Sequence, residues 1–300
     1  MIFVSGTKRS GTSMWMQVLR AAGRPVLGEA FPPAFVGGLR AANPDGFYES
    51  LLRNGIYFAT NPHPVSGRYF LPEHVPGHAV KVFIPGVLRS ERAYIGRLIA
   101  NVRPWQEYEA SLTRMYALED EAMRARGQAV PEDRSERFIM PPAFEWWIEN
   151  FSLVRDITLR RYPARLMSYA QVLADPEGSV AAVLEFIAGE PAAAGAVDDL
   201  AAALTAVKPG HRTQDRPVSA TTLAPEVAAG FDDLHAAVAD GSLFTRPALL
   251  RQLSALNGRL LPELTELQTR ALESELRHAR GKESSAAAIA GLPERLAGFE

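Results

Sequence analysis

Short hydrophobic runs alternate with amphipathic stretches along the chain as far as residue 188. The runs are rich in Val and Ile, as in buried parallel strands, and the stretches between them place apolar residues at helical spacing. The pattern predicts strands over residues 2–5, 78–84, 97–102 and 163–168, and helices over 12–22, 50–60, 104–126, 144–162 and 175–188. Strands that alternate with helices form a parallel sheet covered on both faces. We therefore expect an α/β fold, a three-layer α/β/α sandwich with a parallel sheet of four or five strands.

After residue 188 the chain is rich in alanine and helical in pattern. A leucine stripe at three- and four-residue intervals follows, interrupted by Pro262. Its members are Leu249, Leu253, Leu256, Leu260, Leu264 and Leu267. Such a stripe packs either on its own domain or on a partner helix in a homodimer. We expect a core over 1–217, a helical extension over 218–280 on the core or at a dimer interface, and a flexible tail over 281–300.

Composition narrows the classes of protein to consider. The 300 residues are 47% hydrophobic and 22% charged, which is typical of a globular protein with a sizeable core. A net charge of −2 provides no basic field for nucleic acid or an anionic membrane, so any anion site must be local. Cysteine chemistry is excluded because there is no cysteine, and the six histidines lack metal-ligand spacing. The first apolar run is too short for a signal sequence, so we expect a cytoplasmic protein with no metal site and no membrane anchor.

The first predicted strand runs into a loop with the features of a phosphate-binding loop. Gly6 and Gly11 are separated by four residues, and the hydroxyl side chains of Thr12 and Ser13 open the next helix. Glycines let successive N–H groups point inward, and the helix N-terminus adds partial positive charge. The candidate binding residues are Gly6, Thr7, Lys8, Arg9, Ser10, Gly11, Thr12 and Ser13. The alternative is a glycine turn that binds nothing.

Two parts of an ATP- or GTP-cleaving site are absent from this pattern. Phosphate loops of nucleoside triphosphatases place lysine directly after the second glycine, where this sequence has Thr12. No apolar strand ends in an aspartate that could support magnesium.

The motif Arg9-Ser10-Gly11-Thr12-Ser13 resembles the donor-binding loop of sulfotransferases that use 3′-phosphoadenosine 5′-phosphosulfate (PAPS), in their bacterial-type form. The resemblance implies a phosphate-loop fold of the nucleoside triphosphatase type over 1–217. It also implies that Arg9 and the loop N–H groups hold the phosphosulfate. Arg9 stands where many members carry a lysine that assists the leaving group, adenosine 3′,5′-bisphosphate (PAP).

Further parts of the sequence fit the same family. Arg103 ends a predicted strand and Ser111 follows eight residues later, as in the family's pair for the 3′-phosphate of the donor. An arginine with a hydroxyl suits a dianionic group. The stretch from Tyr169 to Asp175-Pro176 is similar to the family's late strand and turn, which implies Tyr169 at the nucleotide. Arg212 lies in a polar loop where the family adds basic residues to the 3′-phosphate; a plain solvated loop is the alternative.

The candidates for catalysis are Arg9, Lys81 and Glu49. Lys81 lies in an apolar strand, where an unpaired ammonium group is costly, so we expect an anion near it unless it reaches water at a strand edge. Many family members have a histidine base two residues after this lysine, where the sequence has Phe83. Glu49 is the preferred replacement. The alternatives are His63, His74 and His78.

Aromatic residues gather at 47–48, 57–58, 69–70 and 144–147, mostly in irregular segments where the acceptor should bind. Packing in the core is the alternative for about half of them. They favour a small apolar or aromatic acceptor, with a hydroxyl or amine to be sulfated, over a charged polymer. The alternatives are a phosphate-loop kinase that uses ATP and a binding protein that keeps the loop without catalysis.

Overall fold

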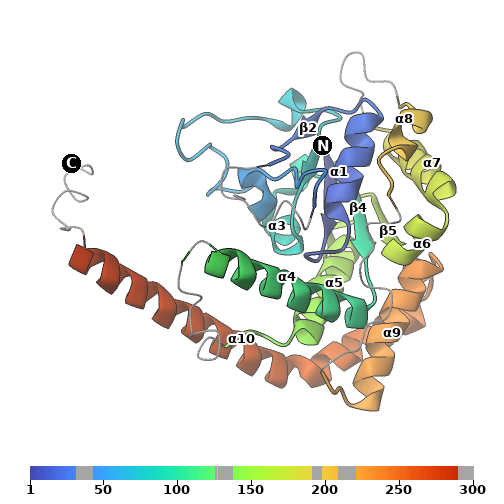
Figure 1. Ribbon diagram of the computed structural model, residues 1–300. Helices are drawn as coiled ribbons and strands as arrows, with labels where there is room; N and C mark the ends of the chain where they lie inside the picture. The colour runs from blue at the N-terminus through green and yellow to red at the C-terminus, as the bar shows by residue number, and fades with distance from the viewer. Residues whose placement is uncertain (32–42, 126, 128–137, 191–197, 209–220, 290–300) are drawn as a thin grey trace.

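Five parallel strands form the centre of the protein (Figure 1). Figure 1 shows the computed structural model, which describes residues 1–31, 43–125, 127, 138–190, 198–208 and 221–289. The strands, in the spatial order β2-β3-β1-β4-β5, are β1 (Ile2–Gly6), β2 (Val26–Leu27), β3 (Ala79–Lys81), β4 (Arg97–Val102) and β5 (Ala164–Ser168). β1 pairs with β3 on one side and with β4 on the other, so the glycine loop of residues 6–13 leaves the middle of the sheet.

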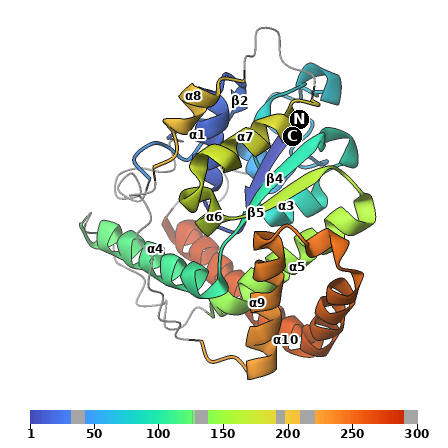
Figure 2. The ribbon, with the colours of Figure 1, turned by 90° about the vertical axis from the view of Figure 1, so that its right-hand side faces the viewer.

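Helices cover both faces of this sheet (Figure 2). Side chains alternate along β1, so that Ile2 and Val4 pack toward α1 (Thr12–Ala21), α7 (Pro176–Ile187) and α8 (Leu200–Leu204). Phe3 packs on the opposite face, toward α3 (Ile84–Arg89) and α5 (Pro142–Arg160). These strand residues are fully buried. The predicted three-layer α/β/α sandwich with a parallel sheet is confirmed.

A second apolar cluster lies beside the sheet. It is built by α5 together with α4 (Trp105–Ala125), α9 (Pro225–Ala239), α10 (Pro247–Ile289) and the 3-10 turn η6 (Leu243–Thr245). The other short elements are α6 (Tyr169–Ala174), η1 (Leu51–Asn54), η2 (Pro72–His74) and η3 (Arg92–Tyr94). Phe231 on α9 stacks on Trp147 of α5, with 4.7 Å between ring centroids. Five leucines of the stripe are buried in the same cluster and Leu267 is partly buried there. The stripe thus packs on helices of its own chain, and α10 continues past the end of α4 (Figure 1).

Some elements differ from the sequence prediction. Helix α10 runs through Pro262 and on to Ile289, across the first part of the expected tail. Burial of leucines on either side of Pro262 holds the helix together despite the missing N–H. The predicted helix 50–60 is the short turn η1, which ends at Gly55 with φ 105°. The predicted strand 78–84 ends at Lys81, because Pro85 occupies the first turn of α3.

Within the described residues, none of the helices combines the length and the apolar character needed to cross a bilayer.

Phe231→Ala should lower the free energy of unfolding by about 3–5 kcal/mol, because it removes the ring that Trp105, Trp146 and Trp147 surround. Urea denaturation measures this loss. The matched control is Phe58→Ala, a ring that is 85% exposed, which should change stability by less than about 0.5 kcal/mol. Similar losses in both variants would contradict the assignment of Phe231 to the centre of the cluster.

Candidate functional site

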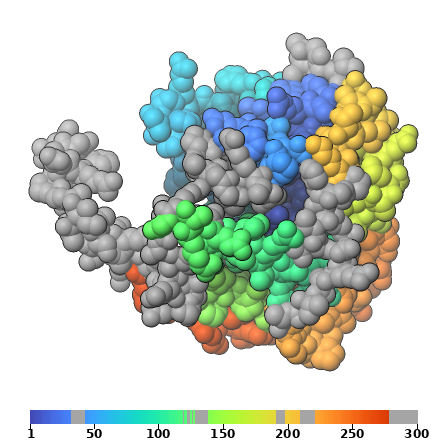
Figure 3. Space-filling model, viewed as in Figure 1, coloured from blue at the N-terminus to red at the C-terminus, as the bar shows by residue number. Residues whose placement is uncertain are grey.

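The candidate site lies where β1 and β4 end side by side. The chain leaves β1 toward β2 and leaves β4 toward β5, in opposite directions across the sheet. Parallel α/β sheets bind ligands outside the carboxyl ends of strands at such a point. Here β1 is followed by the glycine loop and β4 by Arg103. In the space-filling view, dark blue atoms of the N-terminal segment are visible above α4, in green (Figure 3).

The glycine loop is tightly packed against its neighbours. A Cβ atom at Gly6, where φ is 143°, would lie 2.6 Å from the carbonyl oxygen of Asn101. At Gly11, where φ is 92°, it would lie 2.6 Å from the ring of Tyr169. Between them Arg9 has φ 66°, a left-handed conformation that costs about 1–3 kcal/mol and that clusters at functional sites. The surroundings therefore force this loop shape.

Two arginines and one hydroxyl group meet at the loop. Arg9 donates from Nε to Ser111 Oγ at 3.4 Å, and Arg103 donates from Nη1 to the carbonyl oxygen of Arg9 at 3.0 Å. Arg103 also pairs with Glu107 at 3.0 Å, and its guanidinium group lies 5.1 Å from the ring centre of Tyr169. Burial, together with the positive charge of Arg103, lowers the pKa of Arg9. Within the described residues Arg9 has no carboxylate partner, so a bound anion would stabilise its charge.

Lys81 and Glu49 form a buried ion pair beside the loop. Lys81 is 4% exposed and donates from Nζ to Glu49 Oε1 at 2.8 Å, to Ser13 Oγ at 3.2 Å and to the carbonyl oxygen of Phe47 at 3.2 Å. The expected anionic partner of Lys81 is therefore Glu49. The second oxygen of Glu49, Oε2, accepts from Arg53 at 2.7 Å. Burial lowers the pKa of Lys81, although Glu49 acts in the opposite direction.

Two buried donors next to the loop lack partners among the described residues: Thr7 Oγ1 and Asn101 Nδ2. Asn101 is fully buried at the end of β4, and its other side-chain atom, Oδ1, accepts from Trp15 at 2.9 Å. Unsatisfied buried donors are costly and are few in folded proteins. With the glycine cradle and the free charge of Arg9, they fit a phosphate or sulfate group at this edge of the sheet.

Most of the predicted site residues come together here. The loop, Arg103, Ser111, Tyr169, Lys81 and Glu49 all lie at the carboxyl edge of the sheet. Ser10 is buried and donates within the loop to the carbonyl oxygen of Thr7 at 2.7 Å. Thr12 is buried in the first turn of α1. Arg212 falls outside the described residues.

The side chain of Lys8 points out of the loop. Its Nζ lies 3.5 Å from Oε1 of Glu145 on α5. Burial tends to lower the pKa of Lys8, but Glu145 and Glu149 outweigh it, so this pKa is raised.

The alternative histidine bases lie at the amino ends of the strands, opposite the end that carries the glycine loop. His78 directly precedes β3 and His74 belongs to η2, shortly before the same strand. His63 is exposed, in a segment that packs through Phe70 on Tyr94, ahead of β4. Because the strands are parallel, their amino ends are separated from the glycine loop by the length of the sheet. These histidines are therefore remote from the candidate site.

The aromatic residues at 144–147 do not line an acceptor pocket. Phe144, Trp146 and Trp147 pack around Phe231 in the second cluster, because α9 covers this face of α5. At 144–147 the alternative of core packing therefore holds.

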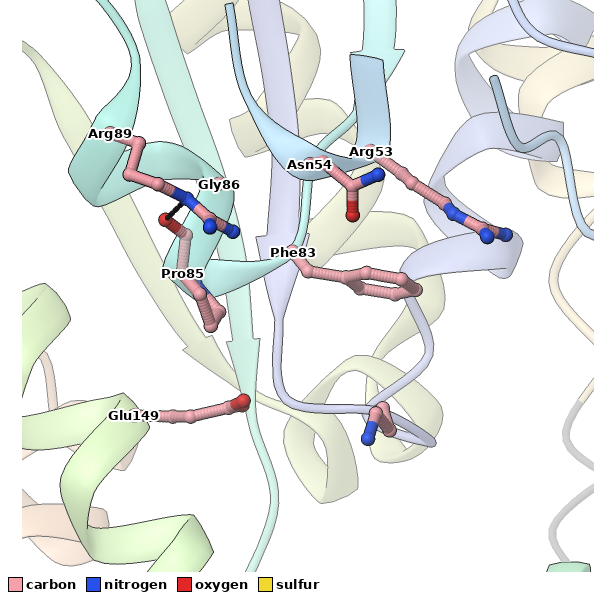
Figure 4. A pocket seen from close by; sticks show the side chains of 8 residues that line it. Arg53, Asn54, Phe83, Pro85, Gly86, Arg89 and Glu149 are labelled. Carbon is pink, nitrogen blue, oxygen red and sulfur yellow. Dashed lines mark hydrogen bonds between the residues drawn. The ribbon is translucent and has the colours of Figure 1, made fainter. Parts of the chain in front are cut away.

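A pocket that the sequence did not predict lies beside the loop. It has a volume of about 140 Å³, and Lys8, Arg53, Phe83, Arg89 and Glu149 are among its lining residues (Figure 4). Burial, together with the charge of Glu145, raises the pKa of Glu149 to about 8. The available signal was a pair of carboxylates one helical turn apart in an otherwise apolar stretch, at 145 and 149.

Fold and site define a three-layer α/β protein whose glycine loop and basic side chains converge at the carboxyl edge of a parallel sheet. No family model and no curated protein matches the chain.

Gly11→Ala should destabilise the protein more than Gly67→Ala does. Both glycines have positive φ, but a Cβ atom at Gly67 would meet nothing within 4 Å, whereas at Gly11 it would collide with Tyr169. We expect a loss of about 1 kcal/mol for Gly67→Ala from backbone strain. Overpacking should add about 1–3 kcal/mol in Gly11→Ala. Urea denaturation compares the two, and equal losses would show that the loop is not held against Tyr169.

Proposed function

We propose that this protein transfers a sulfuryl group from PAPS to a hydroxyl or amine group of a small acceptor. The observation that carries the proposal is the convergence of Arg9, Arg103 and Ser111 on the glycine loop. These residues are far apart in sequence, and they match the donor-binding residues of the sulfotransferase family in type and in order. The proposal is also supported by the charge of Arg9, which has no carboxylate partner among the described residues and which an anionic ligand would stabilise.

The residues suit the two anionic ends of the donor. Arg103 and Ser111 would bind the 3′-phosphate, and Arg9 with the N–H groups of the loop would bind the phosphosulfate. The ring of Tyr169 lies against Gly11 and under Arg103, on the nucleotide side of the site. Bound PAPS supplies an activated sulfuryl group. The protein has to orient it and to stabilise the negative charge of the leaving phosphate.

Lys81 is the cation best placed to act on that charge. Sulfuryl transfer has a loose transition state in which charge builds on the bridging oxygen, so fixed cations assist it strongly. Glu49 and Ser13 hold the ammonium group of Lys81 beside the first turn of α1. Its three N–H groups are engaged by Ser13, Phe47 and Glu49, so Lys81 would act on the donor through its charge. Arg9 would provide the second cation.

The contact between Lys81 and Ser13 also argues against an ATP-cleaving site. In nucleoside triphosphatases the Ser or Thr that follows the loop lysine and an acidic strand end hold Mg²⁺. Ser13 occupies that position in the loop, but its Oγ accepts from the ammonium group of Lys81 at 3.2 Å. A lysine side chain thus stands where a kinase would place its metal. The kinase alternative lacks this part of its machinery.

PAP should raise the melting temperature of the protein more than ATP with Mg²⁺ does. Ligand at one hundred times its Kd stabilises a protein by about 2.7 kcal/mol. Thermal denaturation measures both effects.

Arg103→Ala should weaken PAP binding by about tenfold to a hundredfold, because a charged hydrogen bond is lost. Stronger stabilisation by ATP would favour the kinase, and unchanged PAP affinity in Arg103→Ala would remove this arginine from the site.

Lys81→Met should lower turnover of labelled PAPS by about 10²–10³-fold and change the Kd of PAP only slightly. A metal chelator should leave wild-type turnover unchanged, since the resident cation is Lys81. Turnover is assayed with a panel of alcohols and phenols. Lys208→Met is the control, because this lysine is exposed and pairs with Asp45. PAPS that is bound but consumed with no acceptor of the panel would favour a non-catalytic binding protein.

A further inference from the structure

We propose that the pocket lined by Lys8, Phe83 and Glu149 receives the acceptor, and that the carboxylate of Glu149 takes the proton from the acceptor hydroxyl group. This inference rests on the proposed sulfuryl transfer and adds the base and the acceptor class to it. Sequence reasoning placed Glu49 in the role of base.

The position of the pocket favours this use. One wall is Lys8 of the glycine loop, and the others come from η1, α3 and α5. Figure 4 shows the carboxylate of Glu149 reaching from α5 into the space across from Phe83 and Pro85. A molecule in this space would touch both the loop that binds the donor and the carboxylate.

Glu149 and Glu49 differ in what their oxygens contact. Both oxygens of Glu49 are engaged, one by Lys81 and one by Arg53. Glu149 makes no hydrogen bond and no ion pair with any part of the chain that the structure describes. Its carboxylate therefore has room to accept a proton from a bound molecule.

The charged and titratable groups around Glu149 come from several elements. Lys8 of the loop favours its ionised form, whereas Glu145 on the same helix opposes it. Burial raises the pKa of Tyr108 on α4, and the charges of Glu145 and Glu149 raise it further. The charge of Tyr116 on α4 helps to raise the pKa of Lys8. The guanidinium groups of Arg53 and Arg89 complete the pocket. Burial outweighs the positive charges, which leaves a carboxyl group that exchanges a proton at mildly alkaline pH.

The proposed step is balanced within the site. Glu149 removes the proton of the acceptor hydroxyl group as the oxygen attacks sulfur. A new S–O bond forms to the acceptor, the S–O bond to the 5′-phosphate of PAPS breaks, and the electron pair remains on the phosphate oxygen of PAP. Glu149 then releases its proton to solvent.

The lining of the pocket indicates the chemical class of the acceptor. A cavity of about 150 Å³ accommodates benzene, so the pocket, at about 140 Å³, has room for one ring beside Phe83. Lys8, Arg53 and Arg89 give the lining an excess of positive charge. Arg89 donates from Nε to the carbonyl oxygen of Pro85 at 3.1 Å and has no carboxylate partner in the described chain. We therefore assign a hydroxylated aromatic acid as the acceptor class, with its acid group at Arg89.

The first test is turnover of PAPS with 4-hydroxybenzoate as a function of pH. Wild-type kcat should rise to a plateau through pH 8, because Glu149 acts as a base only when ionised. Glu149→Gln should lose about 10²-fold or more in kcat together with this pH dependence. Glu145→Gln should move the rise to lower pH, because it removes a negative charge that opposes ionisation. Glu185→Gln, an exposed carboxylate on α7, is the control. Wild-type rate and pH profile in Glu149→Gln would overturn the assignment.

The second test does not require turnover. Calorimetry measures binding of 4-hydroxybenzoate and of its neutral amide to the complex of the protein with PAP. Phe83→Ala should abolish both, and Arg89→Ala should weaken only the acid, by about tenfold. These results would support the pocket even if PAPS were never consumed, in which case sulfuryl transfer alone would fail. No binding of either compound to the wild-type complex would overturn the pocket.

The third test reads the protonation of Glu149 from stability. Its pKa is about 8 in the folded protein and near 4.5 when unperturbed, so the stability that it contributes is complete below pH 4.5 and is lost as pH rises through 8. Glu149→Gln cannot ionise. The melting temperature of Glu149→Gln relative to that of the wild type should therefore increase from pH 5 to pH 9. Glu185→Gln should show no such increase. A constant difference across this range would contradict a raised pKa of Glu149 in the folded protein.

Discussion

Positive charge at a buried edge of the sheet is the constraint on which the rest of the site depends. Arg9, Arg103 and Lys81 lie near one another, although burial of an unpaired cation is costly. Protein oxygens hold each of them: Ser111 for Arg9, Glu107 and a loop carbonyl for Arg103, and Glu49 for Lys81. Of these three cations, Arg103 and Lys81 have carboxylate partners among the described residues and Arg9 has none. The charge is therefore compensated incompletely, as binding of the proposed polyanionic donor would require.

The helical extension supports this arrangement from outside the sheet. Ser111 and Glu107 are on α4, and Glu149 is on α5, so the site depends on where these two helices lie. Asp232 on α9 accepts from Trp105 Nε1 at 3.0 Å, and Asn257 on α10 accepts from Trp147 Nε1 at 3.1 Å. Trp146 in turn donates to the carbonyl oxygen of Arg103 at 2.7 Å. The indole groups thus link the extension to the arginine at the end of β4.

Sequence reasoning succeeded where chemistry follows from local pattern. The strand before Gly6 and the helix after Gly11 are both present, and the fold class follows from their repetition along the chain. It failed where contacts between segments distant in sequence determine whether a side chain is buried or lines a pocket. The aromatic residues at 144–147 lie in the core because Phe231, more than eighty residues later, packs on them. The pocket likewise depends on how close α5 comes to Lys8, which the spacing within either segment does not determine.

The two carboxylates near the loop show how environment divides roles between identical side chains. Glu49 lies between Lys81 and Arg53, and its charge fixes the ammonium group beside Ser13. Protonating Glu49 would release Lys81 from the position in which it can act on the leaving group. Glu149 has no comparable ion pair within the described part of the chain, and its neighbour Glu145 is negative. In enzymes, acid and base roles go to carboxyl groups that their surroundings separate in this way. In the proposed reaction, a base that also held the catalytic cation would disrupt that cation whenever it took up a proton, so the division of roles between Glu49 and Glu149 would keep both functions intact.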